Sequence, residues 1–87
     1  MLIHRFKNLT IRFAKEDYLV NGTARFEIED FDEDGKEATF VTAHLLDALG
    51  RDGYVTSEEC LGYLCEATVE HLNGDSTLCR SLGHKII

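Results

Sequence analysis

Hydrophobic and polar residues alternate with a period of two along the first part of the chain. Leu9, Ile11 and Phe13 are separated by polar or small residues, which is the pattern of a strand with one buried face. Residues 2–6 keep the same alternation, either within that strand or in a separate one. We therefore expect the chain up to about residue 41 to form an antiparallel β-meander.

Two hairpin turns are predicted within this region. Asn21-Gly22 lies between two apolar runs, and an Asn-Gly pair in that setting is typical of a two-residue turn because both residues tolerate a positive φ. Asp34-Gly35 predicts a second turn, which joins residues 25–29 to residues 37–41. The second hairpin would place the acidic part of the chain on two neighbouring strands.

The spacing of the apolar residues becomes helical after residue 42. The apolar positions of this segment are Ala43, Leu45, Leu46 and Leu49. They predict a short helix over residues 43–49, ended by Gly50.

The most regular helical pattern covers residues 57–72. Thr56 and Glu59 have the spacing of a capping box, in which Thr56 is the N-cap residue. The apolar stripe of this helix consists of Cys60, Leu61, Leu64, Cys65, Thr68, Val69 and Leu72. Gly62 lies inside the helix, and we expect its missing side chain to let another element approach closely.

A last short helix is predicted over residues 76–82, with Asp75 or Ser76 as its cap and Gly83 at its end. Together these patterns predict one domain over residues 1–87 of the α+β class. The expected fold is an antiparallel β-meander over about residues 2–41 with two or three helices, over about 43–49, 57–72 and 76–82, packed on one face.

Composition narrows the class of protein. The hydrophobic fraction of 44% is that of a globular chain, and no apolar run approaches the roughly 20 residues that cross a bilayer. Charged residues interrupt the apolar residues of the N-terminal segment, which argues against a signal peptide. Three cysteines, an odd number, suggest reduced thiols. We therefore expect a cytoplasmic protein without contact to a membrane.

The formal net charge of -7 argues against direct binding to nucleic acid, which requires lysine and arginine to neutralise phosphates. The charge is also unevenly distributed. Residues 1–15 carry four basic residues and no acid, whereas residues 27–37 carry seven acids and a single lysine. If these two segments are neighbouring strands, their charges partly cancel across the sheet. If they are not, the domain has a negative pole available to a basic partner.

The sequence around the second predicted turn resembles the first half of a calcium-binding loop. Asp30, Asp32 and Asp34 alternate ahead of Gly35, as the oxygen ligands of such a loop do. The twelfth position of the loop, which needs a bidentate glutamate, is occupied by Val41. An acidic hairpin is therefore the preferred interpretation, and a degenerate calcium-responsive module is the alternative.

Four side chains are possible zinc ligands: Cys60, Cys65, Cys79 and His84. Cys60 and Cys65 are five positions apart on a helix, so they do not point at one ion. Their place in or beside the apolar stripe favours buried core cysteines. We expect no metal and no cofactor.

No catalytic signature is present, because the four histidines are scattered and no glycine-rich phosphate loop occurs. We therefore expect a non-enzymatic protein. In size, acidity and lack of a catalytic signature the chain resembles, by composition alone, the small inhibitors that phages encode against host nucleic-acid defences, including anti-CRISPR proteins.

The leading hypothesis is an inhibitor or adaptor that binds the basic surface of a nucleic-acid-handling protein. Its acidic residues would occupy the place of phosphates and speed association. The candidate partner-binding residues are Glu27, Glu29, Asp30, Asp32, Glu33, Asp34 and Glu37. A solvated acidic hairpin that keeps the protein soluble is the plain alternative. A self-associating structural protein, joined through a strand edge or a helical face, is a further alternative.

Overall fold

The computed structural model describes residues 2–31 and 35–85. Its elements are β1 (Leu2–Phe13), β2 (Glu16–Phe31), β3 (Gly35–Gly50), β4 (Gly53–Tyr54), α1 (Glu58–Asn73) and α2 (Ser76–Lys85).

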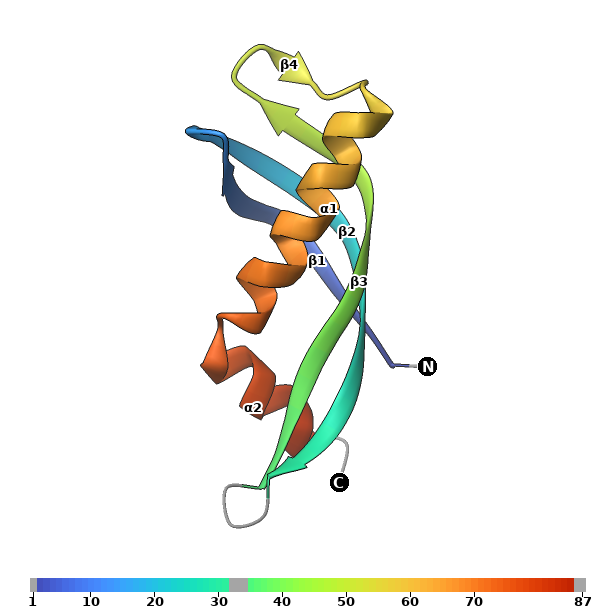
Figure 1. Ribbon diagram of the computed structural model, residues 1–87, viewed down its shortest axis with the longest axis vertical. Helices are drawn as coiled ribbons and strands as arrows, with labels where there is room; N and C mark the ends of the chain where they lie inside the picture. The colour runs from blue at the N-terminus through green and yellow to red at the C-terminus, as the bar shows by residue number, and fades with distance from the viewer. Residues whose placement is uncertain (1, 32–34, 86–87) are drawn as a thin grey trace.

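The four strands form one antiparallel sheet in the order β1-β2-β3-β4. The sheet curls along its length, and α1 and α2 lie on one of its faces (Figure 1). The molecule is elongated, with extents of 46 × 24 × 19 Å. The predicted α+β fold, an antiparallel meander with helices on one face, is confirmed.

The first turn lies at Ala14-Lys15, so the turn predicted at Asn21-Gly22 is wrong. Ala14 and Lys15 have φ values of 52° and 66°, and Phe13 pairs with Glu16 across them. Side chains without a strong preference for positive φ occupy this turn, which is why the sequence does not signal it. The Arg12 guanidinium supports the turn through a 3.2 Å hydrogen bond to the Lys15 carbonyl.

The predicted helix over residues 43–49 is also wrong, because these residues belong to β3. The register of β3 against β2 shifts at two places, and at each shift β3 contains one extra residue, Val41 or Leu46. Each bulge reverses the alternation of the two faces. The positions of β3 that turn toward the helices are therefore 38, 40, 43, 45 and 48, steps of two and three that imitate helical spacing.

Asn21-Gly22 lies in the middle of β2 and joins two bulges. The Asn21 side chain accepts a 2.8 Å hydrogen bond from the N–H of Asn8, the positive-φ residue of a bulge in β1, and donates a 2.7 Å hydrogen bond to Asp47 of β3. Gly22 lets β3 approach, since a Cβ there would lie 2.1 Å from the carbonyl oxygen of His44. The Asn-Gly pair, which is typical of a hairpin turn, here allows a close contact between neighbouring strands.

The long helix confirms the sequence pattern except at its cap. α1 covers Glu58–Asn73, but the Oγ of Ser57, rather than Thr56, accepts the N–H of Cys60 at 3.3 Å. Apart from the local backbone of α1 itself, nothing among the described residues lies within 4 Å of a Cβ added at Gly62, so the expected close approach of another element is wrong.

α2 begins at its predicted cap and runs past its predicted end. The Asp75 carboxylate accepts the N–H of Leu78 at 3.1 Å. Gly83 does not end the helix, which continues to Lys85. Its missing side chain lets α2 lie directly on the β3 backbone, because a Cβ there would be 2.1 Å from the Lys36 carbonyl oxygen.

The core lies between the sheet and the helices in two clusters. One packs α2 and the end of α1 against the middle and far part of β2 and β3, around Phe26, Phe40 and Leu72. The other packs the middle of α1 against β1 and β2, around Ile11 and Leu64. Both described helices cover the same face of the sheet, so among residues 2–31 and 35–85 no helix covers the opposite face.

Candidate partner-binding surface

The acidic part of the chain forms a two-stranded projection, here called the acidic arm: residues 27–31 of β2 and 35–39 of β3. The pairing of β1 with β2 stops where Leu2 meets Phe26, whereas β2 and β3 remain paired as far as Phe31 and Gly35. The arm therefore extends past the end of β1, as the lower part of Figure 1 shows. The predicted hairpin between residues 25–29 and 37–41 is confirmed.

The structure places four of the seven candidate partner-binding residues. Glu27, Glu29 and Asp30 are exposed on β2, and Glu37 is half-buried on β3. The other three, Asp32, Glu33 and Asp34, lie outside the described residues, as does the first residue of the predicted Asp34-Gly35 turn. Gly35 has a φ of 89°, which fits the glycine of that prediction.

Three of these carboxylates lie on the face of the arm opposite Phe26 and Ile28, and we call Glu27, Glu29 and Glu37 the carboxylate row. The strand alternation turns Phe26 and Ile28 toward the core, so Glu27 and Glu29 point away from the helices, whereas the Glu37 carboxylate still reaches Arg80 of α2. Glu29 pairs directly with Glu37 across the two strands. Like charges in directly opposite positions destabilise a sheet, so this pair favours separation of the strands unless a cation compensates it.

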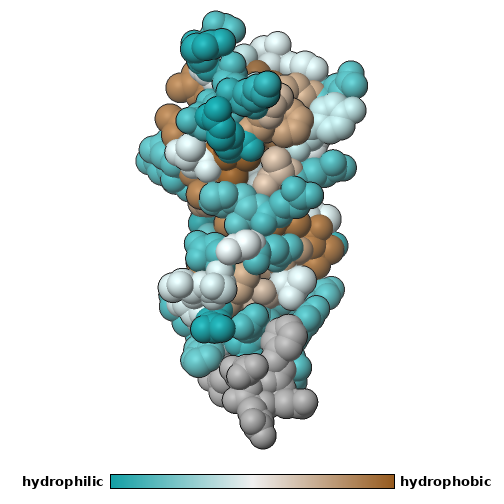
Figure 2. Space-filling model, turned by 60° about the vertical axis from the view of Figure 1, so that its left-hand side comes forward, coloured by the Kyte–Doolittle hydropathy of each residue, from teal (hydrophilic) through white to brown (hydrophobic). Residues whose placement is uncertain are grey.

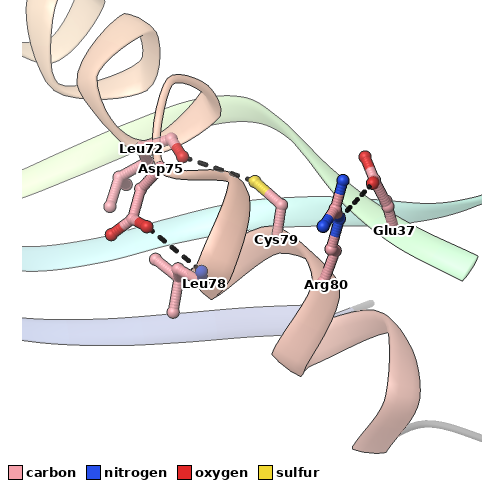
Figure 3. A network of polar contacts seen from close by, with 6 residues as sticks. All are labelled: Glu37, Leu72, Asp75, Leu78, Cys79 and Arg80. Carbon is pink, nitrogen blue, oxygen red and sulfur yellow. Dashed lines mark hydrogen bonds and ion pairs between the residues drawn. The ribbon is translucent and has the colours of Figure 1, made fainter.

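One cation of the domain compensates part of this charge. The Arg80 Nε of α2 lies 3.1 Å from the Glu37 Oε1, and their side chains are 67% and 27% exposed (Figure 3). The Cys79 Sγ donates to the Leu72 carbonyl at 3.4 Å and links the start of α2 to the end of α1. The sequence did not signal this pairing, because Glu37 and Arg80 are far apart in the chain and lie on separately predicted elements.

The basic segment does not lie beside the arm. Arg5 pairs with Thr23, and Arg12 forms a 3.0 Å ion pair with Asp17, so the basic residues of β1 flank the part of β2 that precedes the arm. Arg25 precedes Glu27 on the same face, but no ion pair within 4.0 Å joins them among the ion pairs of the described chain. The two charged segments are thus separated along the molecule, and β1 does not neutralise the acidic arm.

On the face drawn in Figure 2, the coloured residues show hydrophobic side chains interspersed with hydrophilic ones, and hydrophilic residues are frequent just above the part drawn in grey. Recognition through this end of the molecule would therefore depend on charge rather than on a large apolar contact.

The cysteines lie in or against the core, as the sequence predicted. Cys79 is buried, and Cys60 and Cys65 are half-buried, all as free thiols. Burial raises the pKa of the Cys79 thiol, and the nearby carboxylates of Glu37 and Asp75 raise it further. A raised pKa keeps this sulfur protonated, which is unfavourable for a nucleophile or a metal ligand.

No group of three or more metal-ligating side chains converges within residues 2–31 and 35–85. Of the calcium-loop candidates, Asp30 is exposed on β2, while Asp32 and Asp34 lie outside the described chain. Val41, at the twelfth loop position, belongs to a bulge of β3 and offers no side-chain oxygen. The calcium-responsive alternative stays a prediction.

Searches against protein-family models, curated protein sequences and solved structures gave no match to this chain. Within the described residues, neither helix is long and apolar enough to cross a membrane.

Proposed function

We propose that this protein is a small, non-enzymatic inhibitor or adaptor that binds the basic surface of a nucleic-acid-handling protein through its acidic arm. The observation that carries the proposal is the carboxylate row, which lies on a projection where, among residues 2–31 and 35–85, only β2 and β3 pair. Only one of its three carboxylates has an ion-pair partner among the described residues, where Glu37 meets Arg80.

The arrangement suits recognition of a cationic surface in two ways. The row exposes closely spaced negative charges at one end of an elongated molecule, which favours fast, oriented association with a positive groove. The direct opposition of Glu29 and Glu37 also costs stability in the free protein. A basic partner would remove that repulsion on binding, so part of the binding free energy would come from relief of a destabilised pair.

The proposal is tested by affinity capture from the native host with three baits analysed in parallel by quantitative mass spectrometry. The baits are the wild-type protein, the E27K/E29K variant, and the matched control D52K/E59K, which changes the net charge equally at exposed positions outside the arm. We expect a nucleic-acid-binding protein to be captured by the wild type and the control and to be lost by E27K/E29K.

The affinity of each variant for the captured protein then shows whether binding depends on the charges of the arm or only on the net charge of the protein. Each reversed charge at an exposed site changes binding by roughly 1 kcal/mol, so the double variant should bind about ten- to thirtyfold more weakly in low salt. The loss should appear mainly in the association rate and should shrink as salt increases. Equal capture by all three baits, or equal loss in both variants, would contradict a role for the arm.

A further inference from the structure

The outer edge of β3 is closed at both ends and open between them. Near the arm, the Asn73 side chain accepts the N–H of Phe40 at 2.7 Å and donates to the Phe40 carbonyl at 3.0 Å. At the other end, the Ala48 carbonyl accepts the N–H of Val55 at 2.8 Å, and β4 pairs with Leu49 and Gly50. Within residues 2–31 and 35–85, no strand pairs with β3 on this side between the two closures.

Two residues between the closures, Ala43 and Leu45, direct their backbone N–H and C=O groups away from β2. Alternate residues of an antiparallel strand bond to opposite neighbours, and each bulge adds one position. Phe40 and Ala48 bond away from β2, as their contacts with Asn73 and Val55 show. With one position added at each of the bulges at Val41 and Leu46, the alternation turns the backbone groups of Ala43 and Leu45 outward as well. The outward directions of Phe40 and Ala48, on either side, are both consistent with this assignment.

A groove of about 520 Å³ runs beside this open edge, between β3 and α1. Its apolar side chains are those of Val41, which is 41% exposed, and of Ala43, Cys65 and Val69, which are half-buried. Its charged side chains are Glu66 and Glu70 of α1, both exposed. The open edge therefore combines unpaired backbone groups, an apolar floor and a negatively charged wall.

We propose that an extended, basic segment of a partner protein adds to β3 as a further strand at Ala43–Leu45. Its backbone would pair with the outward N–H and C=O groups, which gives affinity independent of side-chain identity. Its side chains on the helix side would place apolar groups on Val69 and lysine or arginine beside Glu66 and Glu70. This site is separate from the acidic arm and does not depend on the function proposed for it.

The charges argue for a basic peptide over a second copy of the chain. An edge-to-edge dimer with a continuous sheet would bring the two copies' Glu66 and Glu70 together around the same groove, in chains that each carry a formal charge of -7. Like charges in such a contact oppose association. A lysine-rich or arginine-rich strand would instead satisfy both the backbone and the wall of the groove.

The test is a titration of the ¹⁵N-labelled protein with a capped lysine–valine peptide, in which lysine and valine alternate along one face of the strand and threonine occupies the other face, followed by amide chemical shifts. We expect saturable shifts at Ala43, Leu45 and Val69. The same peptide with methylated backbone nitrogens at its lysines and valines should cause no such shifts, because it lacks the donors that strand pairing needs. The same peptide with glutamate in place of lysine should also fail, because the groove wall repels it.

Two charge variants test the role of the wall without altering the core. E66Q/E70Q should bind the lysine–valine peptide about three- to thirtyfold more weakly, since each exposed ion pair contributes up to about 1 kcal/mol. D17N/D52N, which makes the same change in net charge elsewhere on the surface, should bind it as the wild type does.

Four results would overturn the proposal. Absence of any shift, or equal binding of the methylated peptide, would show that the peptide does not add to β3 as a strand. Shifts confined to residues 27–31 and 35–39 would assign the basic peptide to the acidic arm, which would support the proposed function and contradict this site. Shifts at Ala43 and Leu45 that depend on protein concentration alone would show that a second copy occupies the edge.

Discussion

Asn73, the last residue of α1, joins the helix to the edge of β3 with both ends of its side-chain amide, and replacing it by alanine tests whether this junction holds the fold. The amide imitates a neighbouring strand, because it accepts from the N–H and donates to the C=O of the same residue, Phe40. Alanine removes both hydrogen bonds and leaves two part-buried backbone groups without these partners.

The magnitude follows from the two lost bonds. A protein hydrogen bond contributes about 1 kcal/mol net, and a buried group left unsatisfied costs about 1–3 kcal/mol. Alanine regains about 0.5 kcal/mol through its higher helix propensity. We therefore expect N73A to lower the free energy of unfolding by about 2–3 kcal/mol, which for a domain of this size lowers Tm by roughly 10–20 °C.

Urea unfolding followed by far-ultraviolet circular dichroism measures this change. E66A, an exposed substitution in the middle of the same helix, should stay within about 0.5 kcal/mol of the wild type. N73D should fall between them, because its carboxylate still accepts the Phe40 N–H but cannot donate to the carbonyl. A loss below about 0.5 kcal/mol in N73A would refute the view that this amide closes the edge.

Three further changes test other parts of the fold. G22A should lose more than about 2 kcal/mol of stability in urea unfolding, because its Cβ would lie 2.1 Å from a backbone oxygen of β3; a near-neutral result would contradict the close strand contact. G62A should instead gain about 0.5–1 kcal/mol by the same measurement, since the position is an exposed helix interior; a loss would reveal a hidden contact. Burial, assisted by the positive charge of Lys85, lowers the pKa of His4 from 6.5, so the unfolded chain binds the proton more readily. This contribution to stability is present above pH 6.5 and is lost as the pH falls from 6.5 toward the lowered pKa; urea midpoints across that range should show a smaller slope in H4Q, and an unchanged slope would contradict the assignment.

The sequence predicted those elements whose signals are local. α1 was predicted to within one residue at each end, because its apolar stripe and its capping residues lie within one continuous segment. The hairpin between β2 and β3 was predicted for the same reason, since its two halves alternate on either side of a glycine-containing turn. In each case the residues that decide the structure are neighbours in the chain.

The errors arose where distant segments set the local structure. The bulges at Val41 and Leu46 depend on pairing with β2, and they broke the alternation that would have identified β3. The partner-binding candidates were correctly assigned to a hairpin, but the pairing of Glu37 with Arg80 required the packing of α2 on β3. Local patterns do not contain such contacts, because they depend on the completed tertiary fold.

The projection of the arm beyond β1 has a consequence for local unfolding. A two-stranded ribbon alone is marginal in water, so the order of the arm depends on α2, which lies on it through Gly83 and Arg80. The arm and α2 should therefore open together as one cooperative unit, at a lower free energy than the three-stranded part of the sheet. In hydrogen exchange, the amides of residues 36–40 and 79–83 would then exchange at matched rates, and occupation of the arm would slow exchange in the last helix as well.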